Sequence, residues 1–140
     1  MGKYIPTETV DPRMPSCPRH SLPPGACDTH CHVFGPFERF PFVTPSSYPP
    51  PFAPFELYNK MLKTVGLQRG ILVQPAPYGT DASALIDALR RGEGRIKGIG
   101  VATDQVSDSE LEKLSESGVV GLRFNEMADP TTGLPLSLIH

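Results

Sequence analysis

Residues 26–34 read ACDTHCHVF, and a glycine and a proline follow them directly. A short run of small, β-branched and aromatic residues that ends in glycine and proline predicts a β-strand. Because side chains alternate along a strand, Asp28, His30 and His32 are expected to point to the same face. The sequence therefore predicts that two imidazoles share one site at the end of the first strand.

Three further strands are expected after this one, with amphipathic helices between them. Short continuous apolar runs are typical of strands buried in a parallel sheet. Gly66 is expected to cap the first helix, and Ser107 with Glu110 forms a capping box for the third. The expected strands are residues 70–74, 96–102 and 119–124, and the expected helices are residues 55–65, about 81–91 and 107–117. Such alternation indicates a parallel α/β fold. By pattern alone it fits a doubly wound sheet or part of a (β/α)8 barrel, which needs about 250 residues.

The rest of the chain is expected to lack regular structure. Residues 1–25 are rich in proline and polar groups, so we expect an irregular N-terminal arm that is ordered only where it lies against something. Residues 35–54 form an aromatic and proline-rich loop that is too apolar for a free linker, so we expect it to pack as a lid. The domain itself is expected over residues 26–125, with an irregular tail at 126–140.

Composition excludes several classes of protein. The net charge of −2 over 140 residues leaves no basic surface for nucleic acid or anionic membranes. No apolar stretch reaches the roughly 20 residues of a membrane helix, and no signal peptide is recognisable, so a cytoplasmic location is expected. The odd count of three cysteines argues against a disulfide framework. Two CxxH pairs, which start at Cys17 and Cys27, leave a small structural zinc module as an alternative.

Four segments together resemble a known family. The runs ACDTHCHVFGPFERFPF, SSYPPP, ILVQPAPYGTD and GVVGLRFN are similar, in order and spacing, to the first four strands of amidohydrolase-superfamily proteins of the 2-pyrone-4,6-dicarboxylate lactonase group. The likeness covers about residues 22–125 and favours the barrel over the doubly wound sheet. It implies a partial (β/α)8 TIM barrel with about the first four strands and three helices.

The resemblance also implies roles for individual residues. His30 and His32 match the first-strand histidine pair, which binds zinc in metal-dependent relatives and acts without metal in the lactonase branch. The expected cofactor is thus none or one divalent metal, with zinc favoured. Tyr48 matches a loop tyrosine that contacts substrate, and Arg123 matches a fourth-strand arginine that binds a substrate carboxylate.

Physical chemistry gives independent support to Arg123. A guanidinium matches the planar geometry of a carboxylate, and an unpaired charge in an apolar strand is costly. A structural pair with Glu126 is the alternative. Gln74 and Thr80 follow the second strand near the same end, where they are candidates for substrate hydrogen bonds or for ordinary turn roles.

The chain departs from the family pattern in two places. Ala76 and Tyr78 stand where the lactonase pattern has a serine and a histidine, which leaves the substrate open. The strands that carry a further histidine and the aspartate general base in this family have no counterpart here. We therefore expect a hydrolase that opens a carboxylated lactone, of the pyrone-dicarboxylate or sugar-acid type, by water attack, with an incomplete site and little activity in this chain alone. An inactive half-barrel that self-associates through its unfinished sheet is the other alternative.

Overall fold

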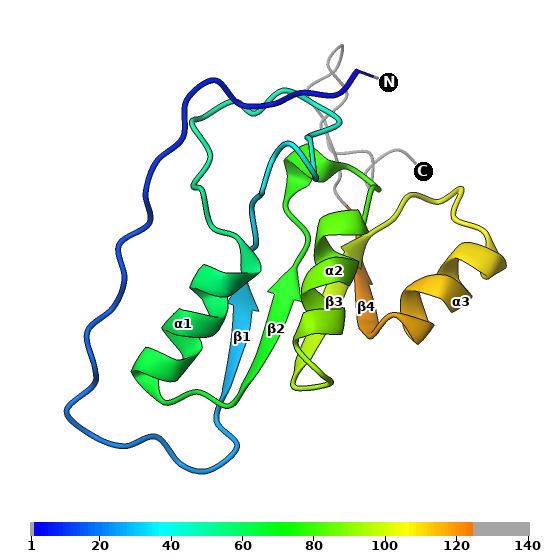
Figure 1. Cartoon of the computed structure of the whole chain (residues 1–140). Coiled ribbons are helices and arrows are strands. Elements are labelled where there is room, and N and C mark those ends of the chain that lie inside the picture. The colour runs from blue at the N-terminus through cyan, green and yellow to red at the C-terminus, as the bar shows by residue number, and fades with distance from the viewer. Residues whose placement is uncertain (1, 125–140) are drawn as a thin grey trace, which may run out of the picture.

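The computed structural model describes residues 2–124 and is built on a four-stranded parallel sheet (Figure 1). Three helices and one short 3-10 turn, η1, connect the strands. The strands are β1 (Cys27–Cys31), β2 (Arg69–Val73), β3 (Ile96–Val101) and β4 (Val119–Arg123). The helices are α1 (Phe55–Val65), α2 (Ser83–Arg91) and α3 (Asp108–Glu116), and η1 spans Ala76–Tyr78. The expected tail at 126–140 lies outside the described residues.

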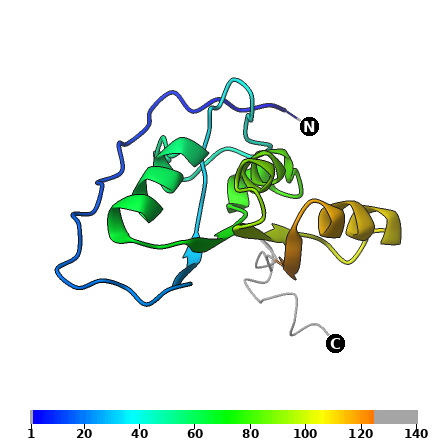
Figure 2. The ribbon, with the colours of Figure 1, turned by 60° about the horizontal axis from the view of Figure 1, so that its bottom comes forward.

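The strand order distinguishes the two candidate α/β folds. The sheet runs β1-β2-β3-β4, so each strand lies beside its neighbour in the sequence and the order never reverses. A doubly wound sheet reverses its order at a switch point, whereas a (β/α)8 barrel adds strands consecutively. Figure 2 shows α1 and α2 on one face of the sheet, with α3 beside β4. The architecture is that of consecutive βα units from a barrel, as predicted.

Local signals in the sequence account for most element boundaries. The α1 helix has the predicted bounds, and Gly66 ends it in the left-handed conformation at φ 80°. The Ser107–Glu110 capping box is present at the start of α3. The α2 helix begins at Ser83 rather than near Asp81, because the Asp81 carboxylate accepts hydrogen bonds from both the backbone N–H and the hydroxyl of Ser83.

The main core lies between the sheet and the first two helices. Apolar residues of α1 and α2 pack on side chains from one face of all four strands. The buried members of this core are Val33, Phe55, Tyr58, Leu62, Leu72, Leu85, Ala88, Leu89, Ile96 and Val119. In the following text this side of the sheet is called the helix face, and the opposite side is called the open face. None of the helices among residues 2–124 is long and apolar enough to span a bilayer.

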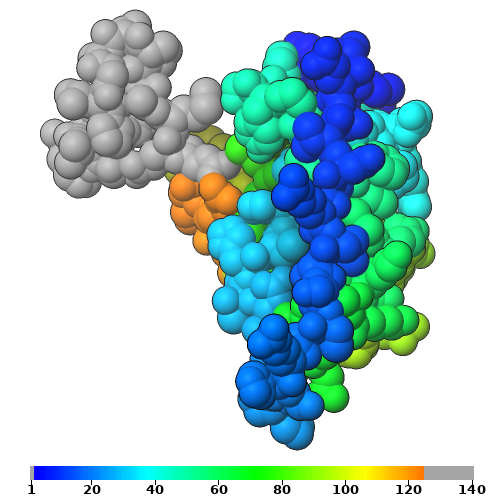
Figure 3. All heavy atoms as spheres, turned by 90° about the vertical axis from the view of Figure 1, so that its left-hand side faces the viewer, coloured from blue at the N-terminus to red at the C-terminus, as the bar shows by residue number. Residues whose placement is uncertain are grey.

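The loop of residues 35–54, called the lid loop below, has a small core of its own. Its aromatic side chains pack against the start of α2 and η1 in a buried cluster of Phe34, Phe37, Phe42, Tyr78 and Ala84. Arg39 also ties the loop to α2 through a 2.8 Å ion pair with the buried Asp87. The N-terminal arm runs along this loop, as the dark blue atoms in Figure 3 show. Backbone bridges join Tyr4 to Phe42 and Val10 to Pro51.

Candidate active site

The predicted histidine pair is assembled at the carboxyl end of β1. The rings of His30 and His32 lie 5.1 Å apart, with their planes at 88°. Nδ1 of His32 lies 2.7 Å from the carbonyl oxygen of Val73, at the end of β2. Because a carbonyl only accepts hydrogen bonds, this contact places the ring hydrogen on Nδ1 and leaves Nε2 for a ligand. A partner of this kind orients the imidazole.

Both imidazoles belong to the open face of the sheet. Cys31 packs against the helix-face core, and Val33 is buried within it. His32 lies between these two residues in an extended segment, so its side chain points the other way. His30 follows it, because the two rings are in edge-to-face contact.

Asp28 does not share this face, contrary to the prediction. The register between β1 and β2 shifts between Asp28 and Cys31, which inserts an extra residue into β1. Asp28 pairs with Gly70, at whose position a side chain would point into Tyr58 of α1. The carboxylate is therefore on the helix face, where its Oδ1 accepts the backbone N–H of His30 at 3.2 Å. A bulge breaks simple alternation, and the strand composition gave no sign of it.

Arg123 ends β4 on the open face. A side chain added at Gly100 would meet Leu122 and Val119, both of which pack on the helix-face core. Arg123 follows Leu122 and pairs with Val101 of β3, so it points to the side that carries the histidines. It forms no ion pair with another residue in the range 2–124. The alternative partner Glu126 lies outside the described residues.

The histidines and Arg123 occupy opposite ends of one sheet. Three strand spacings separate β1 from β4, which amounts to roughly 14 Å along the sheet. The structure thus brings the two imidazoles together and sets the guanidinium apart from them on the same face.

Tyr48 and Thr80 meet at a hollow beside the carboxyl ends of β3 and β4. The hollow has a volume of about 640 Å³ and is bordered by the lid loop and by the segments after β2, β3 and β4. Thr103, which the sequence reasoning did not single out, also borders it, as does Phe124, the neighbour of Arg123. The sequence did contain a signal for Thr103, because it is a polar residue that follows a strand, and such residues gather at one edge of a parallel sheet.

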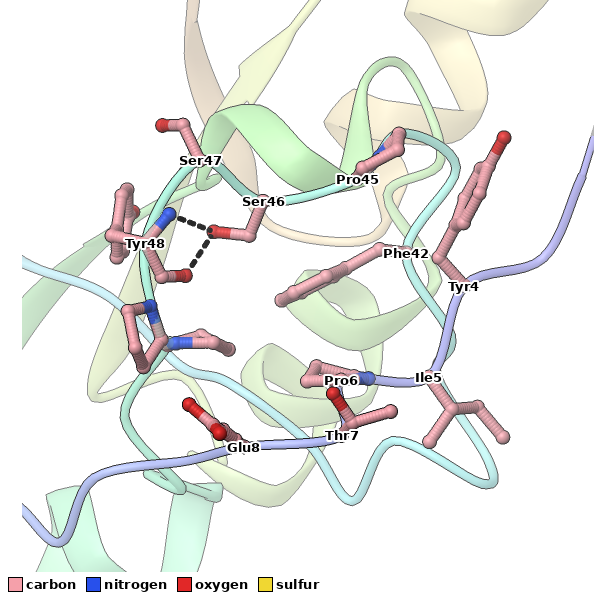
Figure 4. Close-up of a pocket in the computed structure, with 12 residues that line it drawn as sticks. Tyr4, Ile5, Pro6, Thr7, Glu8, Phe42, Pro45, Ser46, Ser47 and Tyr48 are labelled. Carbon is pink, nitrogen blue, oxygen red and sulfur yellow. Dashed lines mark hydrogen bonds between the residues drawn. The ribbon is translucent and has the colours of Figure 1, made fainter.

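A second hollow of about 350 Å³ lies between the N-terminal arm and the lid loop (Figure 4). The arm segment 4–8 forms one wall and Phe42 lies across the interior, while neither histidine borders it. Tyr48 is 52% exposed and borders both hollows. The hydroxyl of Ser46 donates to the carbonyl of Tyr48 at 2.7 Å and accepts its N–H at 3.4 Å. Ser46 therefore holds the backbone of Tyr48, a local turn role that is common for serine.

Gln74 is only 1% exposed, and its side-chain amide joins three backbone groups. Its amide nitrogen donates to the carbonyls of Gly79 at 2.7 Å and Asp81 at 3.1 Å, and its oxygen accepts the N–H of Val101 at 3.3 Å. Both amide hydrogens are thus used within the chain. Of the two roles considered for Gln74, this geometry matches the structural one, because it shapes the loop that carries Thr80.

The two departures from the lactonase pattern have different surroundings. Ala76 borders the hollow of Tyr48 and Thr80. Tyr78 instead lies in the loop core, where its hydroxyl accepts the N–H of Gly35 at 2.9 Å and burial raises its pKa to about 12. Only the change at Ala76 therefore alters the surface that a ligand in this hollow would meet.

The donor set for a metal is incomplete within the described chain. Among residues 2–124 no three histidine, cysteine or acidic side chains are grouped so that they could hold an ion. The pair at His30 and His32 offers two ligands, whereas catalytic zinc takes three from the protein. The same result means that the alternative zinc module is not assembled among residues 2–124. Burial, and next the nearby Asp28, raise the pKa of the Cys31 thiol, which keeps it protonated and a poor ligand.

Comparison with known proteins finds longer relatives. The family profile described as amidohydrolase matches residues 27–135. The chain is 40% identical over 106 residues to a 4-sulfomuconolactone hydrolase of Hydrogenophaga intermedia and 39% identical over 111 residues to a 2-pyrone-4,6-dicarboxylate hydrolase of Comamonas testosteroni. These matches cover 76% and 79% of this chain but only 35% and 36% of the relatives. The chain thus spans little more than a third of their length.

Solved structures give the same result for the fold. A probable 2-pyrone-4,6-dicarboxylic acid hydrolase of Acinetobacter baumannii, solved with citric acid bound, matches with a TM-score of 0.65 at 30% identity, over 78% of this chain and 42% of that one. A second such hydrolase, from Pseudomonas putida, matches with a TM-score of 0.60 at 32% identity, over 73% of this chain and 37% of that one. An Agrobacterium tumefaciens protein matches at 0.66 and 23% identity over 89% and 43%, which supports the fold alone.

Proposed function

This chain belongs to the amidohydrolase family, and we propose that it carries the substrate-holding part of a hydrolase that opens a carboxylated lactone by attack of water. The relatives named above act, by their names, on a sulfonated muconolactone and on a pyrone dicarboxylate. Both ligands combine an ester-type carbonyl with a strongly acidic group. A site for them needs one group that holds the anion and another that stabilises the carbonyl oxygen as it gains charge.

The observation that carries the proposal is the shared open face of the imidazole pair and Arg123. The guanidinium has five donors in a planar fork and no ion-pair partner among residues 2–124. It is therefore suited to a bidentate bond with a substrate carboxylate. The hollow that its neighbour Phe124 borders is also bordered by Tyr48 and Thr80, whose hydroxyls can donate further hydrogen bonds to an acid group.

At the other end of the ligand, His30 and His32 face the lactone carbonyl. With Nδ1 hydrogen-bonded to Val73, His32 presents its Nε2 edge to the open side, where the lactone carbonyl is held. Water attack also needs a carboxylate or imidazole that accepts the proton. Asp28 is not assigned as that base, since it lies on the helix face, and both imidazoles are assigned here to the lactone carbonyl. We therefore propose that the chain alone turns over little lactone.

Binding of 2-pyrone-4,6-dicarboxylate to the 140-residue chain tests the proposal. In an NMR titration we expect shifts at Arg123, Thr80 and both histidines, with binding about tenfold weaker in Arg123→Gln, which removes a charged hydrogen-bond donor. Arg95→Gln is the matched control, because this arginine lies far from β4's end and contacts Asn59 and Gln68 instead. Equal weakening in both variants would contradict a specific carboxylate site at Arg123. Rapid hydrolysis by the chain would contradict the claim that its residues lack the base.

A second candidate role is association of two chains through the edges of the sheet. Within residues 2–124, both β1 and β4 have a hydrogen-bonded neighbour on one side only, and Val120 on β4 is exposed. Unpaired strand edges are templates for pairing with another chain. Light scattering coupled to size-exclusion chromatography tests this candidate, for which Val120→Lys is expected to shift the chain towards monomer. A monomer at all concentrations would rule it out.

A further inference from the structure

Tyr58 of α1 presents a buried hydroxyl to β1 and β2, next to the strand that carries the histidine pair. The residue is 4% exposed, and its hydroxyl oxygen is buried with no partner at hydrogen-bond geometry among residues 2–124. It occupies the space that a side chain at Gly70 would need, so a Cβ there would collide with it. An unpaired buried hydroxyl is costly, and the glycine at the second position of β2 leaves room for it.

Asp28 supplies a carboxylate beside this hydroxyl that can accept a hydrogen bond. Gly70 and Asp28 are direct partners across β2 and β1, so the space above Gly70 adjoins the Asp28 carboxylate. Burial, followed by the charge of Asp28, raises the pKa of the Tyr58 hydroxyl. The phenol is therefore a neutral donor that faces an acceptor-only carboxylate.

Asp28 in turn holds the backbone where the histidine pair begins. Its Oδ1 accepts the N–H of His30 at 3.2 Å, and the register shift between β1 and β2 lies between Asp28 and Cys31. Without the extra residue of this shift, strict alternation would place Asp28 and His30 on the same face. The shift is what separates the carboxylate, on the helix face, from the imidazoles, on the open face.

We propose that Tyr58 is a positioning residue, whose hydroxyl donates to the Asp28 carboxylate and so fixes the bulge that turns His30 and His32 to the open face. Tyr58 touches no ligand in this scheme. It acts through Asp28 and the His30 amide, and Gly70 supplies the room. The inference rests on the proposed function for one point only, which is the role of the histidine pair in binding the lactone.

Amide hydrogen exchange in the 140-residue chain tests the linkage without any substrate. Tyr58→Phe keeps the ring and removes one oxygen, so we expect about tenfold faster exchange of the His30 N–H, because one hydrogen bond to a charged group is lost. The ring resonances of both histidines should shift as well. Tyr4→Phe, which removes the hydroxyl of an exposed tyrosine, is the control and should change neither.

The coupling between Tyr58 and Asp28 provides the decisive comparison. In an Asp28→Ala background the His30 amide has already lost its acceptor, so Tyr58→Phe should add no further increase in exchange. Equal fold-changes in both backgrounds would overturn the proposal. If Tyr58→Phe left the exchange of the His30 N–H unchanged and made the protein more stable, the Tyr58 hydroxyl would make no hydrogen bond. That result would also overturn the proposal.

A measurement on the unsubstituted chain covers the case in which a variant does not fold. A hydroxyl that donates to a buried carboxylate should give a slowly exchanging proton signal with a nuclear Overhauser contact to the β protons of Asp28. A rapidly exchanging Tyr58 hydroxyl proton would overturn the proposal. Because none of these measurements involves turnover, a chain that proves inactive on every lactone would leave the inference intact.

Discussion

The two faces of the sheet differ in whether helices of the described chain cover them. On the helix face, side chains from all four strands meet α1 and α2, and Leu72 has no exposed surface. On the open face, neighbouring positions of the same strands carry His30, His32 and Arg123, and the described chain supplies no helix to cover them. One face is therefore a finished core, whereas the other holds the polar groups that the chemistry needs.

Alternate residues of a strand point to opposite faces of the sheet, so residues that stabilise the fold and residues that carry the chemistry can be neighbours in the sequence. A substitution on the helix face should act through packing, and one on the open face through ligand binding. The predictions below test this separation, from the largest expected effect to the smallest.

Truncation of a core side chain should show the strongest asymmetry between the faces. Leu72→Ala is expected to lower the free energy of unfolding by about 3 kcal/mol, because it leaves a cavity under the helices. Ile71→Ala, one position along β2 on the open face, should cost about 1 kcal/mol or less, since Ile71 is only half-buried. Urea unfolding followed by circular dichroism measures both. Similar losses would mean that the open face is also packed in solution.

Loss of the buried carboxylate on α2 should have the next largest effect. Asp87 accepts hydrogen bonds from Arg39 of the lid loop at 2.8 Å and from Arg90 at 3.0 Å. Asp87→Asn weakens both, so we expect a loss of about 1–2 kcal/mol in unfolding free energy. Asp104→Asn, at an exposed position, is the control. An unchanged stability would show that the lid loop is held by its aromatic core alone.

The capping box of α3 should have a smaller effect that depends on pH. Ser107→Ala is expected to cost about 1 kcal/mol at pH 7, while Ser115→Ala, inside the same helix, should cost nothing. Hydrogen bonds from Ser107 lower the pKa of Glu110 below its ordinary value. A lowered folded pKa adds stability above the ordinary pKa of glutamate, and this part is lost as the pH falls through the folded value. The cost of Ser107→Ala should therefore shrink in acid, and a constant cost across pH 3 to 7 would contradict the reciprocal cap.

The arm should have the smallest effect on stability and a local effect on the lid loop. Val10 donates its N–H to the carbonyl of Pro50 at 3.0 Å and accepts the N–H of Phe52 at 3.0 Å. Val10→Pro removes the first bond, so we expect less than about 1 kcal/mol of destabilisation but faster amide exchange at Phe52. Thr9→Pro, where no backbone N–H bond is lost, serves as the control. Unchanged exchange at Phe52 would show that the arm does not hold the loop.

Periodicity and punctuation predicted most of the fold. The apolar spacing of residues 55–65 gave α1 its full range, and glycine and capping signals placed the ends of the other helices within a few residues. Thr80 was expected near the carboxyl ends of the strands, and it borders the hollow there, since parallel strands share one carboxyl end. These signals are local, so they can be read without the tertiary structure.

The structure added what depends on partners far away in the sequence. The position of Asp28 follows from a bulge that forms only when β1 pairs with β2, and no pattern within residues 26–34 indicates it. The sequence left Gln74 with two candidate roles, a substrate hydrogen bond or an ordinary turn role, and its three backbone partners match the second. Tyr78 likewise departs from the family pattern in sequence but fills the loop core in space.

The sequence by itself thus determined the parallel α/β architecture, the candidate residues and the family, because strand, helix and motif signals lie in short segments of the chain. Only the tertiary structure decided which side of the sheet each candidate faces and which polar groups are already hydrogen-bonded within the chain. The physical reason is that facing and pairing depend on register between strands, where a shift of one residue reverses every side chain.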